Sequence, residues 1–74
     1  MTTKNGIIVV DAGDGTIAIK KADIQSVHSI QYFSPVYYSS LFVTLVGHVK
    51  PLVIDFSCSG AEKAEKLLVS EWTA

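Results

Sequence analysis

The period of the hydrophobic pattern changes near residue 58, and this change constrains the fold more than any other feature of the sequence. Between residues 51 and 56 apolar side chains fall on alternate positions, which is typical of a β-strand with one buried face. Beyond residue 60 they recur three or four residues apart, which is typical of an amphipathic helix. The helical stripe consists of Ala61, Ala64, Leu68 and Trp72. The chain is therefore expected to lead from a strand into a helix over residues 59–73.

The start of this helix carries a recognisable signal. Ser59 and Glu62 have the spacing of a capping box, in which the two side chains each accept a hydrogen bond from a backbone N–H of the first turn. Glu62 and Lys66 lie four residues apart in the favourable order for an ion pair. We expect the capping box to fix the beginning of the helix.

The residues before the helix indicate strands joined by short turns. Alternating or β-branched runs occupy residues 6–11, 16–21, 27–33, 41–46 and 51–56. Connections this short favour antiparallel neighbours, since parallel strands need a crossover of about a dozen residues or more. The sequence predicts an α+β domain: an antiparallel sheet of about five hairpin-connected strands, flat or strongly curled, followed by one C-terminal helix on one face. Residues 1–74 form one domain, with a flexible tail at 1–5, a β meander at 6–56 and the helix at 59–73.

The amount of apolar surface raises the question of a second subunit. The chain has 74 residues, of which 49% are hydrophobic. A core of this size is close to the lower limit for independent stability. One helix covers only one face of a sheet, yet residues 6–11 and 41–46 are apolar on both faces. Either the sheet curls around an interior of its own or another copy covers the remaining face, and we favour the homo-oligomer.

Charge and cysteine content argue against several classes of partner. A net charge of −1 gives no long-range attraction to nucleic acid or anionic lipid. No stretch approaches the roughly 20 apolar residues of a membrane-spanning helix, and the apolar run before Asp11 is short for a signal peptide. Cys58 is the single cysteine, so an internal disulfide is impossible. We expect a cytoplasmic protein without membrane contact.

One glycine-rich stretch is similar in sequence to nucleotide-binding motifs. Residues 11–16 resemble the Asp-x-Gly-x-Gly-Thr phosphate hairpin of the actin and sugar-kinase superfamily, and Gly13, Gly15 and Ala18 match the spacing of a dinucleotide fingerprint. The fingerprint requires a helix after the glycines to hold the pyrophosphate. Residues 16–19 instead favour a strand. We interpret the stretch as a hairpin turn and expect no cofactor.

The residues able to bind metal or act as nucleophiles are scattered. His28 and His48 lie twenty residues apart, and Cys58 has no second thiol beside it. Structural zinc sites usually show paired ligands two to four residues apart. A nucleophilic Cys58 would need a base, and His48 is the available candidate. We expect no metal site, no catalytic residues and no enzymatic activity.

An aromatic segment around Pro35 is the best candidate for a contact surface. Four of the six Tyr and Phe residues fall between positions 32 and 38. Tyrosine is favoured at protein interfaces because it adds large contact area and keeps a polar group. The interface candidates are Tyr32, Phe33, Tyr37, Tyr38, Phe42 and Val46.

Two functions agree with this composition. The favoured hypothesis is a small non-enzymatic protein-interaction module that associates with itself through a sheet face or the aromatic hairpin. The alternative is a single-stranded nucleic-acid-binding domain that stacks bases on strand-borne aromatic rings. The alternative would depend on Lys20 and Lys21 for phosphate contacts, because the chain contains no arginine.

Overall fold

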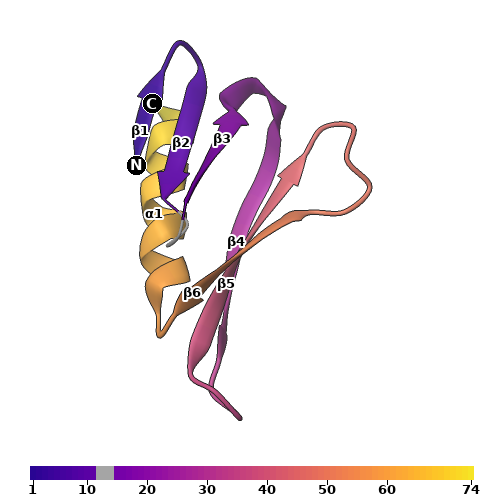
Figure 1. Ribbon diagram of the computed structural model, residues 1–74. Coiled ribbons are helices and arrows are strands. Elements are labelled where there is room, and N and C mark those ends of the chain that lie inside the picture. Colours follow the sequence, from indigo (N-terminus) through magenta and orange to yellow (C-terminus); the bar gives the residue numbers. More distant parts are fainter. Residues whose placement is uncertain (12–14) are drawn as a thin grey trace.

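The computed structural model describes residues 1–11 and 15–74. Its strands and helices follow one another along the chain as labelled in Figure 1. The elements are β1 (Thr2–Lys4), β2 (Ile7–Asp11), β3 (Thr16–Lys20), the 3₁₀ turn η1 (Lys21–Asp23), β4 (Ile24–Tyr32), β5 (Tyr38–Leu45), β6 (Leu52–Ser57) and α1 (Gly60–Thr73). The predicted turn at residues 12–15 falls largely outside the described residues.

The strands form two antiparallel sheets of three strands each, in the orders β1-β2-β3 and β4-β5-β6. This confirms the predicted α+β class, with antiparallel strands followed by one C-terminal helix. The strands are divided between two sheets because η1 turns the chain between β3 and β4. Backbone hydrogen bonds fix this corner: Lys21 N–H donates to the Gly6 carbonyl at 2.8 Å, and Val46 N–H donates to the Asp23 carbonyl at 2.8 Å.

The N-terminal residues are not the flexible tail that the sequence suggested. Thr2 to Lys4 form β1, which pairs with β2 through the register Lys4↔Ile7. Asn5 and Gly6 make the turn between them with φ angles of 54° and 75°. Positive φ at both positions is the signature of the two-residue turn that Asn-Gly favours. The Asn5-Gly6 dipeptide was therefore the sequence signal for the additional strand.

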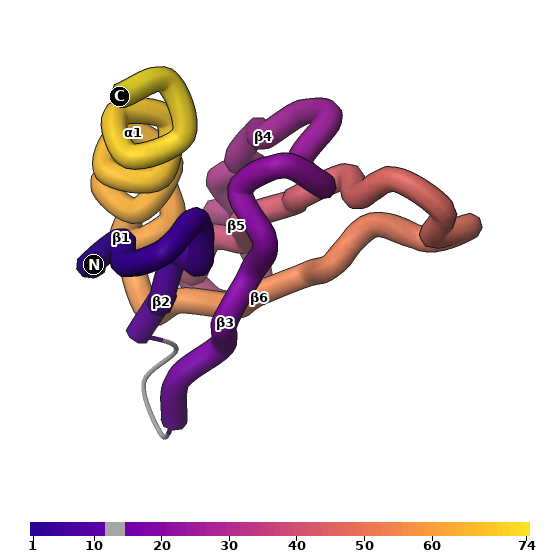
Figure 2. The backbone as a smooth tube through the Cα atoms, turned by 90° about the horizontal axis from the view of Figure 1, so that it is seen from above, coloured from indigo at the N-terminus to yellow at the C-terminus, as the bar shows by residue number. Residues whose placement is uncertain are grey.

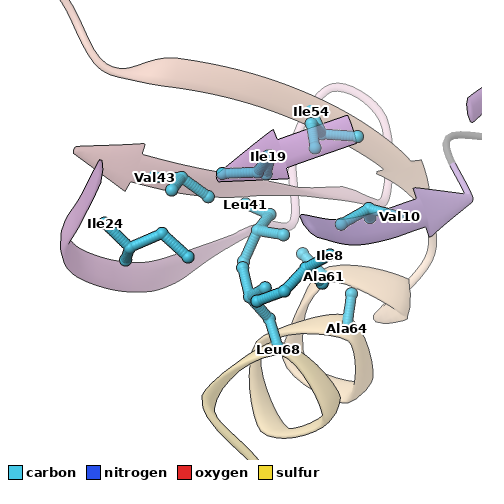
Figure 3. Packing of buried hydrophobic residues seen from close by; sticks show 10 residues of the cluster. All are labelled: Ile8, Val10, Ile19, Ile24, Leu41, Val43, Ile54, Ala61, Ala64 and Leu68. Atoms are coloured by element: carbon cyan, nitrogen blue, oxygen red, sulfur yellow. The ribbon is translucent and has the colours of Figure 1, made fainter. Parts of the chain in front are cut away.

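Both sheets and the helix contribute to one hydrophobic core, shown in Figure 3. Isoleucine and valine side chains of β2 and β3 meet those of β5 and β6 beside the apolar stripe of α1. The buried cluster consists of Ile8, Val10, Ile19, Ile24, Leu41, Val43, Ile54, Ala61, Ala64 and Leu68. The alternation predicted for residues 41–46 and 51–56 is confirmed, since Leu41, Val43 and Ile54 are buried and Val53 is exposed.

The helix begins where the sequence predicts, but a different contact satisfies its first turn. Ser59 occupies the N-cap position without a side-chain capping hydrogen bond, so the predicted capping box does not form. Its carbonyl accepts a bond from the Glu62 N–H at 3.2 Å. The buried Ala61 N–H instead donates to the Ser39 hydroxyl oxygen of β5 at 2.9 Å. A tertiary contact thus replaces the local cap, because the strand brings a hydroxyl to a helix end that is closed to water.

The second sheet extends beyond the packed core at two places. The connection between β4 and β5, residues 33–37, projects past the first turn of α1 in Figure 1. Figure 2 shows the connection between β5 and β6, residues 46–51, extending away from α1 on the opposite side of the sheet. The molecule measures 39 × 25 × 21 Å along its principal axes.

Candidate interaction surface

The sheet β4-β5-β6 has an inner face against the core and an outer face away from it. Directly paired residues of antiparallel strands point to the same face. The pairs His28↔Phe42 and Tyr32↔Tyr38 therefore share a face, and Phe42↔Val53 continues it onto β6. We call this face, made of His28, Ile30, Tyr32, Tyr38, Phe42 and Val53, the outer aromatic face. α1 packs on the opposite face of the same sheet, which carries Leu41, Val43 and Ile54.

Two stacked ring pairs organise the outer aromatic face. The rings of Tyr32 and Tyr38 have centroids 4.6 Å apart and planes inclined by 15°. The imidazole of His28 lies parallel to the Phe42 ring, with centroids 4.9 Å apart and an angle of 6°. Each pair bridges β4 and β5, and the pair Ile30↔Ser40 lies between them. Such pairs contribute about 0.5–1.5 kcal/mol beyond area burial.

Aliphatic side chains complete this surface and remain accessible. Ile30 is 40% exposed and Val53 is 47% exposed. Ser40 lies between the two ring pairs and donates its hydroxyl hydrogen to the Asp55 carboxylate at 2.5 Å. An exposed, contiguous group of large apolar side chains is informative, whereas single exposed ones are common on any protein.

The connection between β4 and β5 forms a second exposed aromatic group, the tip, made of Phe33, Val36 and Tyr37. Phe33 is 73% exposed and its ring is tilted by 44° to that of Tyr37, with centroids 5.7 Å apart. The tip adjoins the Tyr32–Tyr38 pair that closes the hairpin. The outer aromatic face and the tip therefore form one surface along one hairpin.

The structure brings five of the sequence-predicted interface residues to this surface and leaves one apart. Tyr32, Tyr38 and Phe42 lie on the outer aromatic face, while Phe33 and Tyr37 lie on the tip. Val46 follows the end of β5 and is held beside η1 through its N–H, at the other end of the hairpin.

Three members of the outer aromatic face were not among the predicted interface residues. They are His28, Ile30 and Val53. Each belongs to a strand whose alternation was visible, but their common face depends on the registers β4-β5 and β5-β6. The register makes His28 a stacking partner of Phe42.

Polar side chains occupy the inner face behind the aromatic end of the hairpin. The Gln31 amide donates to the carbonyls of Tyr38 at 2.8 Å and Cys58 at 3.2 Å. The Ser29 hydroxyl donates to the Glu65 carboxylate of α1 at 2.5 Å. Together with the Ser39 contact to the helix N–H, these bonds attach the hairpin to the turn before α1 and to its first turns. We call Ser29, Gln31 and Ser39 the polar lock.

The charges near the outer aromatic face are few. Asp55 brings a carboxylate onto it, and none of its described positions carries a lysine. Lys20 ends β3 in the other sheet, and the Lys21 ammonium donates to the Ala74 carbonyl oxygen at 2.6 Å. The two lysines expected to contact phosphate in the alternative hypothesis therefore lie on a different sheet or its following turn.

The side chains able to perform chemistry are not assembled. His48 lies in the connection before β6, and Cys58 follows the end of that six-residue strand. The strand separates them by roughly 20 Å at its normal rise per residue. Over residues 1–11 and 15–74, no group of three or more His, Cys, Asp or Glu side chains has the arrangement of a metal site.

Two shallow clefts lie away from the outer aromatic face. One, of about 170 Å³, is lined mainly by β2, Phe56 and the first turns of α1. The other, of about 440 Å³, lies between η1 and Trp72. Neither is lined by a cluster of polar groups that would orient a small molecule. No helix in the described part of the chain has the length and apolar character needed to cross a bilayer.

Comparison of the chain with protein-family models, with curated proteins and with solved structures found no match.

Proposed function

We propose that the protein is a small non-enzymatic interaction module that associates with itself through the β4–β5 hairpin. The observation that carries this proposal is the reversed polarity of the hairpin's distal half. There, the polar lock faces α1, while exposed Ile30 and the half-buried rings of Tyr32 and Tyr38 lie on the opposite face of the sheet. A strand that serves only to build a core places its apolar residues inward.

This reversed polarity reduces the apolar burial that stabilises the domain, and a contact surface gives a reason for it. Inward-facing Ser29, Gln31 and Ser39 contribute little apolar burial to a domain whose core is already small. Their hydrogen bonds hold the hairpin rigidly on α1, so that the aromatic residues are presented without loss of much conformational entropy on binding. Rigid tyrosine rings on a supported hairpin suit protein recognition for that reason.

A second copy of the chain is the partner that we propose. The exposed apolar side chains extend from the tip along the hairpin to Ile30 and Val53, and a like surface buries them without bringing strong charge together. We place the module in the cytoplasm as part of the same proposal, on the presence of the single free thiol of Cys58.

Solution mass tests this function most directly. We expect the mass from light scattering or sedimentation to exceed that of one chain at micromolar concentration. The double substitution Tyr37→Ser and Tyr38→Ser should lower the mass of the assembly while the circular dichroism spectrum stays unchanged. Val49→Ser is the matched control, because Val49 is fully exposed in the connection between β5 and β6, far from the tip. A mass of one chain for the unmodified protein over this range would reject the proposal.

The stacked ring pairs are the observation that favours the alternative of single-stranded nucleic-acid binding. Rings on a sheet face stack bases, but such sites combine them with a basic groove for the phosphates. The Asp55 carboxylate on this face opposes that arrangement. The alternative predicts salt-sensitive binding to oligonucleotides that weakens in a Lys20→Ala, Lys21→Ala variant. Absence of binding at low salt would exclude it.

A further inference from the structure

The four strands at sheet borders differ in how they are protected against pairing with another chain. β1 has three residues and includes Lys4, and β3 has five residues and ends at Lys20. β6 has six residues, follows Pro51 and contains Asp55. β4 has nine residues, without a charge, proline or glycine. Charge, proline and short length are the usual means by which proteins keep an edge strand from adding a further strand.

The outer edge of β4 is free of backbone pairing. β5 occupies one side of β4, and β4 is the last strand of the sheet at its border in Figure 2. Among the described residues, no backbone or side-chain group bonds to the main chain of β4 between Ser26 and Gln31 other than those of β5. A register shift lies between Ile24 and Ser26, and seven consecutive residues from Ser26 to Tyr32 then pair regularly with β5. Their remaining N–H and C=O groups are available to a further strand.

We propose that β4 pairs antiparallel with β4 of a second copy, so that two three-stranded sheets become one sheet of six strands. This inference rests on the proposed self-association and specifies which part of the hairpin makes the contact. The two-fold axis runs through the centre of the strand, so that either His28 or Ser29 lies opposite its own symmetry copy. Such an interface is closed, because each edge is satisfied by the other.

The residue pattern of β4 identifies a second copy as the occupant. A two-fold axis perpendicular to the sheet keeps the outer face of one copy on the same side as the outer face of the other. With Ser29 on the axis, outward His28 lies opposite the partner's Ile30 and inward Ser29 lies opposite its own copy. With His28 on the axis, the two imidazoles lie opposite each other on the outer face. β4 is also uncharged, so self-pairing brings no like charges into opposition.

The pairing has a consequence for the outer aromatic face. Since β4 lies at the junction, the ring pairs of the two copies flank the two-fold axis on one surface. The dimer therefore presents an aromatic surface about twice as wide as that of one chain, while both tips remain free. The tips and this joint surface are then available for contacts between dimers.

Site-directed crosslinking tests the pairing. The probe is the full chain with Cys58→Ser, into which His28→Cys or Ser29→Cys is introduced singly. Opposed residues in an antiparallel pair have Cα atoms about 4.5–5.5 Å apart, within the range that a disulfide spans. We expect mild oxidation to give a covalent dimer at one of these two positions. Val53→Cys, on the same face but on β6 at the other border, is the matched control and should stay uncrosslinked.

A charge substitution gives a second test of the pairing, one that does not depend on cysteine chemistry. His28→Lys places an ammonium on the edge, and we expect roughly a tenfold or larger increase in the dimer dissociation constant from like-charge opposition and blocked pairing. Val53→Lys should leave the constant unchanged. Circular dichroism of both variants checks that each is folded.

The outcomes separate the two proposals. Crosslinking at position 28 or 29 with an unaffected Val53→Lys dimer supports pairing through β4. A dimer that crosslinks at position 53, or that is weakened by Val53→Lys and not by His28→Lys, overturns edge pairing and leaves self-association through the sheet face. Single chains at every concentration overturn both.

Discussion

The two halves of the β4–β5 hairpin follow opposite rules of polarity. In the half near η1, the inward pair Val27↔Val43 is apolar and the outward pair Ser26↔Thr44 is polar. In the half near the tip, the inward pair Gln31↔Ser39 is polar and the outward pair Tyr32↔Tyr38 is aromatic. One hairpin thus builds the core at one end and carries an exposed aromatic surface at the other.

Three residue pairs separate Val27↔Val43 from Gln31↔Ser39, and different forces support the hairpin on the two sides of this change. Near η1, burial of Val43 and Ile24 in the shared core stabilises the hairpin through the hydrophobic effect. Near the tip, hydrogen bonds to α1 and to the turn before it replace that burial. Every buried side-chain nitrogen and oxygen atom among the described residues has a hydrogen-bond partner, so the distal half incurs no penalty for unpaired groups. The distal half is therefore attached to α1 and to the turn before it by contacts that do not involve the aromatic rings.

The largest expected effect comes from the boundary between the two regions. Leu41 is fully buried and Phe42, the next residue, lies on the outer aromatic face. We expect Leu41→Ala to lower the free energy of unfolding by about 2–5 kcal/mol, and Phe42→Ala by about 1–2 kcal/mol because its ring is partly solvated and loses mainly the stack on His28. Denaturant unfolding measures both. Equal losses would contradict the division into a core face and a contact face.

A second pair of neighbours tests the polar lock. Ser39→Ala removes the acceptor of the buried Ala61 N–H, and we expect it to lower the free energy of unfolding by about 1–2 kcal/mol. Ser40→Ala removes a bond to the Asp55 carboxylate, which is exposed and regains water, so we expect a smaller loss. Thermal unfolding of the two variants compares them. A larger loss at position 40 would show that the Ser39 contact does not anchor the helix.

The sequence was sufficient to predict the core half of this molecule and not the other. The alternation around Leu41 and Ile54 and the stripe through Ala61 and Leu68 predicted their burial, because both patterns are local consequences of strand and helix geometry. The contact of Ser39 with Ala61 joins residues 22 positions apart and depends on how α1 crosses the sheet. No local pattern contains that information.

The candidate surface was predicted in composition but not in arrangement. The density of rings between residues 32 and 38 indicated the tip and the Tyr32–Tyr38 pair. The inclusion of His28, Ile30 and Val53 required the strand register, which turn geometry and long-range packing determine together. The additional strand β1 is a different case, since the Asn5-Gly6 turn signal and the strand-forming Thr2 and Thr3 were all present in the local sequence.

Gln31→Leu tests whether the distal half depends on hydrogen bonds. Leucine restores an apolar inward residue of similar size but removes the amide that joins the hairpin end to Cys58. We expect a loss of about 0.5–1.5 kcal/mol, since the carbonyls left behind are partly exposed. Hydrogen exchange should accelerate at residues 32–38 before it does in the core. Gln25→Leu is the matched control at an exposed position of the same strand. If hydrogen exchange at residues 32–38 accelerated equally in the Gln25→Leu variant, a specific role for Gln31 would be refuted.

The smallest effect on stability is expected at the outer aromatic face itself. Ile30 lies in the distal half, points away from α1 and is 40% exposed, so Ile30→Lys forfeits little buried area and leaves the polar lock intact. We expect the free energy of unfolding to change by less than about 0.5 kcal/mol, measured on samples dilute enough to hold single chains. At higher concentration the same variant should associate more weakly than the unmodified chain, because the ammonium lies within the contact. Val49→Lys, at the fully exposed position in the connection between β5 and β6, gives the reference for adding a charge away from this surface. Strong destabilisation of the dilute Ile30→Lys chain would show that this face helps to hold the fold together, and the contrast between the two halves of the hairpin would then disappear.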